Sequence, residues 1–301
     1  MERIPTPEPG VYADVPFEMY LAWDAVDCSF LKQMDHSSEY AHYCLTHPDP
    51  DKKAYAKGRL FHLLCVEPEQ ADAEYILQPA KYIDRKTGEE KKWHGGANVC
   101  KQWALDQAAS GRSITDQDVM DECVGMANRV RTHPKLGPLL AGAQVEVSVV
   151  WLDAATGVTC KGRFDLYRSG IVVDLKSTSG SAKPSRWFYE AYKYQYHLQC
   201  AMYLDAVKAL KLTEEVPWFV FAAVEGYAPY SVACYDVYDD IDALSYDFLL
   251  LGRIRYRALL QHYSWCVEHD EWPGYGDEHM DMELPFAGRK ELEQLTEFEA
   301  A

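Results

Sequence analysis

Alternating hydrophobic and polar residues predict a β-rich centre for the chain. The five predicted strands span residues 145–151, 158–167, 171–176, 218–224 and 230–235. In the first of them, valines and a tryptophan occupy every second position, and Glu146 and Ser148 lie on the opposite face. Ser169 and Gly170 form a two-residue turn that would join the second and third strands as a hairpin.

A hydrophobic period near 3.6 residues predicts helices before, between and after these strands. They span residues 29–47, 53–66, 115–132, 185–210 and 240–262. In the fourth helix Trp187, Ala191 and Leu198 recur at helical spacing. Residues 81–101 are basic and rich in turn formers, which predicts a hairpin or a long loop. The order of elements predicts an α/β (α+β) fold with a mixed central β-sheet flanked by helices.

Length and composition suit one large globular domain or two small ones. The 301 residues are 48% hydrophobic, which is enough to bury a core. We expect a single domain over residues 1–275, with its core at about 53–262, and an acidic tail over 276–301 whose simplest interpretation is disorder. The first ten residues lack a signal-peptide pattern and no apolar run is long enough to span a membrane, so we expect a cytoplasmic protein. Nine scattered cysteines without a CxxC motif are expected to be buried thiols.

The net charge of −17 argues against a simple nucleic-acid binder, but the charge is unevenly distributed. Residues 266–301 carry eleven acidic side chains and two basic ones. Residues 161–193 carry seven basic side chains and three acidic ones. The basic zone coincides with the predicted hairpin, so a polyanionic substrate at that zone is still permitted.

The hairpin places one aspartate on each strand among apolar neighbours. A two-residue turn at Ser169 and Gly170 pairs Asp165 with Asp174. A four-residue loop gives the same pairing, whereas a three-residue loop would not. Opposed residues in a sheet have Cβ atoms about 4.5–5.5 Å apart. Two half-buried carboxylates at that separation need a cation or a shared proton. Because side chains alternate along a strand, Lys176 lies on the same face as Asp174.

This cluster of two carboxylates and one amine predicts a metal site. Glu146 on the neighbouring strand could join it, and oxygen ligands without thiolates suit Mg²⁺ or Mn²⁺. A lysine beside the metal could orient or deprotonate water, or stabilise charge on a phosphate. The alternative is a solvated hairpin in which Lys176 forms a surface ion pair. The apolar strand at residues 171–175 implies burial and favours the metal site.

At these residues the sequence resembles the PD-(D/E)xK nuclease superfamily. Asp165 fills the first acidic position, and Asp174 and Lys176 supply the (D/E)xK motif. Residues 162–165, Gly-Arg-Phe-Asp, match the G-x-x-D form of the first motif. No proline precedes Asp165, a departure that is frequent in this superfamily.

More narrowly, the chain resembles the branch that contains RecB-type nuclease domains and the bacteriophage exonuclease VIII (RecE) group. The supporting residues outside the hairpin are His62 in Gly-Arg-Leu-Phe-His, Glu146 on the preceding strand, and Gln199 and Tyr203 of a QxxxY motif. Segments 85–93 and 271–275 also look like RecE-type exonucleases. The resemblance covers residues 29–275, and it implies a restriction-endonuclease-like core.

The resemblance also implies a set of site residues. The implied cofactor is Mg²⁺, which Mn²⁺ can replace, in a two-metal site. The implied metal ligands are His62, Glu146, Asp165, Asp174 and the Leu175 carbonyl. The implied catalytic residues are Lys176, Asp165, Asp174, Glu146, Gln199 and Tyr203. Candidate DNA-binding residues are Arg59, Ser177, Thr178, Gln195, Lys91, Lys92 and Trp93. Simpler roles stay open for several of them: a core histidine for His62, a buried ion pair for Glu146 and a solvated hairpin for residues 81–101.

As a function, the resemblance implies an exonuclease that degrades one strand of double-stranded DNA from its 5′ end. It further implies a homo-oligomeric ring (a trimer or tetramer), a single-strand annealing partner (RecT-like) and a role in DNA recombination in a bacterial or phage-infected cell. The alternatives are a structure-selective or restriction-type endonuclease of the same superfamily, and a catalytically inactive DNA-binding module. An unrelated α/β metal-binding protein is a more distant alternative. The sequence leaves polarity and processivity open.

Overall fold

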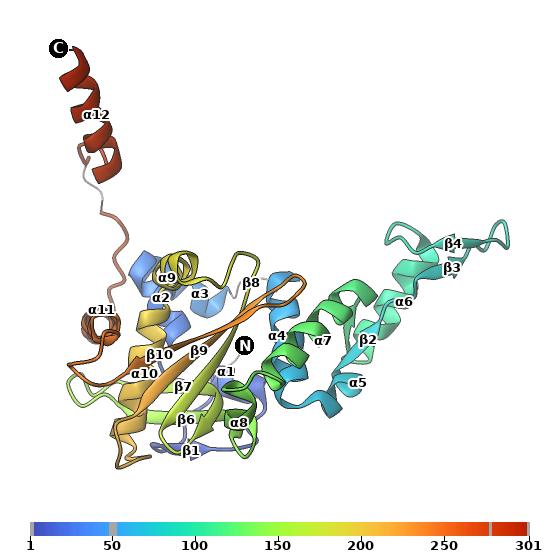
Figure 1. The fold of residues 1–301 in the computed structure, drawn as a ribbon, viewed down its shortest axis with the longest axis horizontal. Helices are drawn as coiled ribbons and strands as arrows, with labels where there is room; N and C mark the ends of the chain where they lie inside the picture. The colour runs from blue at the N-terminus through green and yellow to red at the C-terminus, as the bar shows by residue number, and fades with distance from the viewer. Residues whose placement is uncertain (1–2, 48–52, 277–278, 300–301) are drawn as a thin grey trace.

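A six-stranded mixed sheet forms the centre of the protein (Figure 1). The computed structural model describes residues 3–47, 53–276 and 279–299. In spatial order the strands are β1 (Gly10–Tyr12), β6 (Gln144–Leu152), β7 (Thr159–Arg168), β8 (Ile171–Thr178), β9 (Trp218–Glu225) and β10 (Val232–Tyr238). Strands β8 and β9 are parallel, and every other neighbouring pair is antiparallel. The mixed α/β fold that the sequence predicts is confirmed.

The first face of the sheet is covered by α2 (Cys28–His36), α10 (Tyr196–Ala209) and α11 (Tyr246–His269). These helices pack against alternate strand residues such as Val172 and Phe219, which are fully buried. Helices α10 and α11 pack against each other, and their backbones approach closely where Gly252 of α11 meets His197 of α10. We call this layer the α10/α11 core.

The second face is covered by α4 (Lys53–Val66), α7 (Gln117–Arg131) and α8 (Leu136–Leu140). Here the intervening strand residues, among them Val173 and Leu175 of β8, contact the helices. The predicted alternation along β8 is therefore confirmed, because Val173 and Leu175 point away from the face that carries Val172. We call this layer the α4/α7 core.

An arm extends from the second layer (Figure 1). Its elements are η1 (Pro68–Gln70), α5 (Ala71–Glu74), β2 (Tyr75–Leu77), β3 (Lys81–Ile83), β4 (Glu90–Lys92), α6 (Asn98–Ala109) and β5 (Ser113–Thr115). Strands β2 and β5 form a parallel pair, and β3 and β4 form an antiparallel hairpin. Of the two predictions for residues 81–101, a hairpin or a long loop, the hairpin is correct for the first half of the segment. Helix α6 begins in the second half.

Two predicted helices are each broken in two. Ser37 interrupts the first, because its side chain accepts a hydrogen bond from the N–H of Tyr40 and so begins α3 (Ser38–Thr46). Gln195 interrupts the helix predicted at 185–210, which becomes α9 (Pro184–Lys193) and α10. Its backbone is left-handed, with φ of 55°, a conformation that cannot continue a right-handed helix.

The acidic tail contains a helix, which corrects the expectation of disorder. Helix α12 (Phe286–Glu299) points away from the sheet (Figure 1). Residues 277–278 and 300–301 of this tail lie outside the described residues. All nine cysteines are described, and each is a free thiol. Among the described residues, no helix combines the length and the apolar character that a membrane crossing requires.

Lys161 is a structural residue rather than part of a basic surface. It is 3% exposed, and its Nζ donates hydrogen bonds of 2.8–3.0 Å to the carbonyls of Tyr20, Leu21 and Trp23. These carbonyls lie at the end of α1 (Phe17–Ala22), where a helix leaves acceptors without intrahelical donors. Lys161 therefore joins the N-terminal helix to β7.

Replacing Lys161 by methionine is expected to lower the free energy of unfolding by about 2–4 kcal/mol, because three carbonyls at the end of α1 lose the hydrogen bond from its ammonium group. Urea unfolding measures this loss. Lys135→Met, at an exposed position, is the matched control and is expected to change little. Equal stability of the two variants would contradict the capping role.

Candidate active site

Strands β7 and β8 separate where the two hairpin aspartates lie. The predicted pairing is confirmed for Arg168 with Ile171 and for the next two pairs, after which the ladder ends. Asp165 and Asp174 come next in register. Instead of a ladder bond, the N–H of Leu175 donates a 2.7 Å hydrogen bond to Oδ2 of Asp165. A carboxylate therefore replaces the backbone acceptor, and this bond fixes its position at the opening between the strands.

Asp174 is held from two sides in the interior. It is 2% exposed, its Oδ2 lies 2.6 Å from Nζ of Lys176, and its Oδ1 accepts a 2.7 Å hydrogen bond from Nε2 of Gln199 on α10. Burial raises the pKa of Asp174. Burial would lower the pKa of Lys176, but the nearby carboxylates outweigh it, Asp174 first, and raise that pKa. The lysine is thus an ammonium ion that lies next to Asp174.

Three potential metal ligands meet beside this pair. His62 on α4, Glu146 on β6 and Asp165 on β7 each offer one ligand atom, and these atoms lie within 4.8 Å of one another. Nδ1 of His62 lies 3.4 Å from Oδ2 of Asp165. One imidazole nitrogen and two carboxylates are a donor set that divalent cations accept, so these residues fit a metal site.

Glu146 also takes part in an ion pair. Its Oε2 accepts a 2.6 Å hydrogen bond from Nε of Arg163, whose guanidinium also donates to the Val15 carbonyl and the Ser148 hydroxyl. Burial and the charge of Asp165 raise the pKa of Glu146, against the effect of Arg163. The sequence left two roles open for Glu146, a buried ion pair and a metal ligand. In the structure Glu146 forms the ion pair and also lies within the ligand cluster.

The β6–β7 ribbon changes face at this cluster. Val145 packs in the α4/α7 core whereas Val147 packs in the α10/α11 core, and the opposing strand makes the same change between Leu166 and Phe164. Glu146, between the two valines, has a left-handed backbone with φ of 49°. The sequence predicted one face for Val145 and Val147, and this prediction is wrong because strict alternation cannot anticipate a left-handed residue. The twist brings Glu146 and the aspartate opposite it to the border between the two cores.

The two QxxxY residues on α10, Gln199 and Tyr203, contact different neighbours. Gln199 contacts Asp174, as described above. Tyr203 is buried, its ring packs on Phe164, and its hydroxyl lies 3.5 Å from the N–H of Arg163. A Cβ at Gly162 would approach the Tyr203 ring to 2.9 Å, so the glycine of the G-x-x-D motif leaves room for the tyrosine of QxxxY. Tyr203 therefore positions β7 and does not reach the ligand cluster.

Of the candidate DNA contacts, Arg59 and Ser177 are exposed close to the site, because Arg59 lies one turn before His62 and Ser177 follows Lys176. Thr178 is buried, and its hydroxyl donates to Glu190. Gln195 donates to Asp35 of α2 rather than facing the strands.

The hairpin residues are not brought to the site. Lys91, Lys92 and Trp93 lie on or next to β4 at the far end of the arm (Figure 1). Lys91 forms an ion pair with Asp84, and Trp93 makes an edge contact with Trp103. A DNA contact there would be remote from the carboxylates.

Sequence reasoning missed Arg163 and Tyr196. The sequence signal for Arg163 was its position two residues before Asp165 on the same predicted strand. Tyr196 supports Lys176, whose Nζ lies 5.0 Å from the ring centroid. No spacing in the sequence could reveal this contact, because it depends on the break at Gln195.

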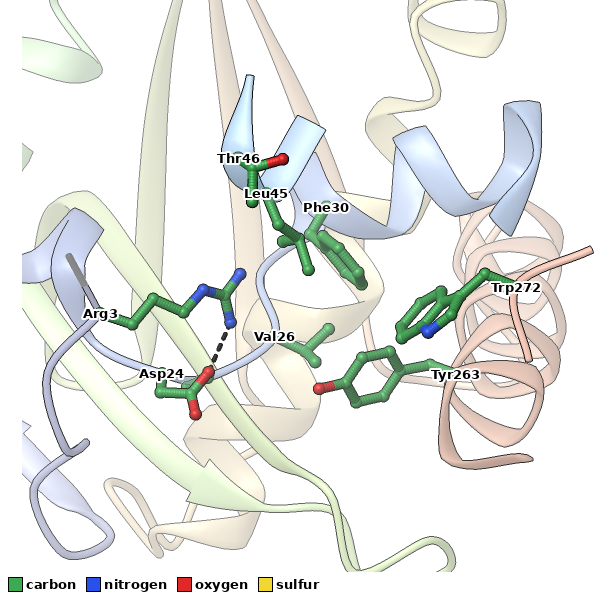
Figure 2. Close-up of a pocket in the computed structure, with 9 residues that line it drawn as sticks. Arg3, Asp24, Val26, Phe30, Leu45, Thr46, Tyr263 and Trp272 are labelled. Atoms are coloured by element: carbon green, nitrogen blue, oxygen red, sulfur yellow. Dashed lines mark hydrogen bonds and ion pairs between the residues drawn. The ribbon is translucent and has the colours of Figure 1, made fainter. Parts of the chain in front are cut away.

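A cavity of about 360 Å³ lies apart from these residues (Figure 2). Phe30, Tyr263 and Trp272 supply its aromatic wall, and an ion pair joins Arg3 and Asp24 at its border. None of its lining residues belongs to the ligand cluster or to the Asp174–Lys176 pair. The carboxylate cluster, not this cavity, is therefore the candidate active site.

The contact between His62 and Asp165 has a defined pH dependence in metal-free protein. Burial would lower the pKa of His62, but the Asp165 carboxylate outweighs it and raises the pKa from 6.5 to about 9. A raised histidine pKa contributes stability that is complete below pH 6.5 and is lost as the pH rises through about 9. We expect His62→Asn to be most destabilising near pH 6 and least destabilising near pH 9.5.

Urea unfolding with a chelator at these two pH values measures the difference. His269→Asn, at an exposed position of α11, is the control. A cost of His62→Asn that increases with pH would contradict the assigned ion pair.

A mixed sheet that opens around two aspartates, with a lysine two residues after the second, defines a member of the PD-(D/E)xK nuclease superfamily. The model of one family, described as "PDDEXK-like domain of unknown function (DUF3799)", matches residues 27–283. The chain belongs to this family. Family and fold together support a nuclease.

A solved structure has a similar fold. It is the crystal structure of a protein from Eubacterium rectale that is named provisionally as an exonuclease. The TM-score is 0.52 at 13% sequence identity, and the match covers 89% of this chain and 97% of the other. No curated protein matches the sequence. The RecE branch stays a prediction, because neither match names it.

Proposed function

We propose that this protein is a Mg²⁺-dependent exonuclease that degrades one strand of double-stranded DNA, from 5′ to 3′, and so produces single-stranded DNA for annealing. The observation that most directly supports this proposal is the cluster of His62, Glu146 and Asp165. It lies beside the Asp174–Lys176 pair, where β7 and β8 separate. The provisional name of the similar protein from Eubacterium rectale favours an exonuclease over an endonuclease.

The residues at the opening would hold the cation. We assign His62, Glu146 and Asp165 as the first set of ligands. Asp174 and the Leu175 carbonyl, which are outside that cluster, are proposed to extend it toward a two-metal site. When bound, Mg²⁺, or Mn²⁺ in its place, supplies a Lewis acid that neutralises phosphate charge and activates water.

The protein's own groups position the reaction. Lys176 presents an ammonium donor, which we assign to orienting the attacking water and stabilising negative charge on the phosphate. Gln199 holds Asp174 through its amide N–H, and Tyr203 holds β7 from behind. Arg59 precedes His62 by one helical turn, Ser177 follows Lys176, and both are exposed; they are assigned to the DNA backbone.

More distant contacts are also part of the proposal. Lys92 is exposed on the arm, where it would meet DNA away from the reacting phosphate. A homo-oligomeric ring would gather basic residues around the DNA despite the net charge of −17. A single-strand annealing protein is the proposed partner for the product.

The test uses duplex DNA labelled at each 5′ end in turn, with Mg²⁺, beside closed circular plasmid. We expect labelled mononucleotides from the 5′ ends and an intact plasmid. Nicked plasmid would instead indicate an endonuclease with the same site. The absence of metal-dependent cleavage of any DNA would overturn the proposal.

DNA binding is expected to weaken steeply with salt, despite the acidic composition. Neutralising several phosphates releases counterions, so affinity should fall by roughly 100-fold or more between about 50 and 200 mM salt. Fluorescence anisotropy with a chelator measures this without cleavage. Nearly constant affinity over this range would contradict a basic DNA channel.

A further inference from the structure

Three aromatic side chains of helix α9, and that of Tyr194, the residue that follows the helix, are exposed to solvent. Phe188, Tyr189, Tyr192 and Tyr194 are 59, 62, 51 and 51% exposed. The opposite side of the helix is buried through Trp187 and Ala191. We call the four exposed rings the α9 aromatic face. Large exposed aromatic patches mark interaction sites in soluble proteins.

The α9 aromatic face is continuous with the candidate active site. The Tyr194 ring stacks on Tyr196, with centroids 5.9 Å apart. Tyr196 in turn lies beneath the Nζ of Lys176, at 5.0 Å. One ring therefore separates the exposed face from the lysine at the opening of the strands.

Cations alternate with these rings. Nζ of Lys193 lies 5.4 Å from the Tyr194 centroid, and the guanidinium of Arg255 lies 5.7 Å from that of Tyr192. Lys32 of α2 lies 5.4 Å from Tyr196. Alternating rings and cations can bind bases and phosphates respectively.

Two carboxylates near these rings, Glu190 and Asp35, have partners of their own. Glu190 accepts a 2.8 Å hydrogen bond from the Thr178 hydroxyl, and Asp35 accepts one of 2.6 Å from Gln195. Glu190 also lies 3.6 Å from Nε of Arg186. In the described part of the chain, neither carboxylate forms an ion pair with Lys193, Arg255 or Lys32.

Two rings are also held in place from behind. Tyr192 stacks on the buried His197 at 5.8 Å, and the two planes differ by 16°. Tyr194 rests on Tyr196, which itself stacks on Phe221 in the core. Rings fixed in this way lose little conformational entropy when a base stacks on them.

We propose that the α9 aromatic face binds unpaired nucleic acid, the single-stranded part of the strand on which Lys176 acts. Bases stack on Tyr192 and Tyr194, and phosphates contact Lys193, Arg255 and Lys32. Inside a duplex the bases already stack on each other, so successive bases can stack on these rings only when the strand is unpaired. This inference rests on the proposed nuclease function, and it specifies where the unpaired strand lies.

The test measures the affinity of a fluorescein-labelled oligothymidine by anisotropy, with a chelator present so that no cleavage is needed. We expect Tyr192→Ala and Tyr194→Ala each to weaken binding about tenfold. Tyr192→Phe and Tyr194→Phe keep the ring and should bind as wild type does. Phe286→Ala, at an exposed position of the distant α12, is the control and should have no effect.

Lys193→Glu, which leaves every ring in place, is expected to weaken binding and to reduce its salt dependence. Wild-type affinity in both alanine variants would overturn the proposal, as would equal losses for blunt duplex and single strand. If the alanine variants change only the oligomeric state in sedimentation, the face joins copies of this chain and the proposal is also wrong. Binding is measured without metal, so it does not depend on cleavage. A protein that binds the oligothymidine but cleaves no DNA would reject the proposed nuclease function without affecting the test of single-strand binding.

Discussion

Lys176→Met is expected to lower the rate of DNA hydrolysis by at least about a thousandfold, while DNA binding changes little. The ammonium group lies at the opening between β7 and β8, 2.6 Å from Asp174, and methionine fills its volume without a charge or a donor. A group that stabilises charge only as the phosphate reacts affects turnover far more than binding. Single-turnover cleavage of end-labelled duplex, beside anisotropy, separates the two.

Lys101→Met, at an exposed position of α6, is the matched control and should keep full activity. Thermal unfolding of Lys176→Met must accompany the assay, because the variant leaves Asp174 buried without its cation. A folded variant that cleaves within tenfold of wild type would remove Lys176 from the reaction.

Asp165→Asn is expected to weaken Mn²⁺ binding by about 100-fold and to lower cleavage by a thousandfold or more. Asp165 is the residue that contacts His62 and the Leu175 N–H and also lies opposite Glu146. An amide keeps the shape and can still accept from Leu175, but it removes the charge that a cation requires. Isothermal titration calorimetry with Mn²⁺ measures the affinity.

Asp106→Asn, at an exposed position of α6, is the control for the same chemical change. Unchanged Mn²⁺ affinity in Asp165→Asn would show that the cluster of His62, Glu146 and Asp165 does not hold the metal. The proposed cofactor site would then have to be abandoned even if the protein cleaves DNA.

The sheet and the hairpin could be predicted because their signals are local. Alternation located β6, β7 and β8 to within a few residues, and the turn at Ser169 and Gly170 fixed the register of the hairpin. The register in turn placed Asp165 and Asp174 together with Lys176. Short-range geometry was sufficient for this part of the site.

The remaining features depend on contacts between distant segments. Strand β1 pairs with β6 across more than a hundred residues, and three residues carry too little pattern to predict a strand. The left-handed backbones at Glu146 and Gln195 are not typical of those residue types, so tertiary packing must impose them. Without the break at Gln195, neither the position of Tyr196 nor the α9 aromatic face could be inferred.

The division of the protein into two cores has a consequence for how the site is assembled during folding. His62 is carried by α4, which belongs to the α4/α7 core, whereas Gln199 is carried by α10 of the α10/α11 core. Neither layer supplies every residue of the site. A local opening of the α4/α7 layer would remove His62 from the two carboxylates, and an opening of the α10/α11 layer would remove Gln199 from Asp174, before the whole chain unfolds. A partly folded intermediate would therefore be unable to cut DNA. During refolding, the onset of DNA cleavage would show that both helical layers have packed on the sheet.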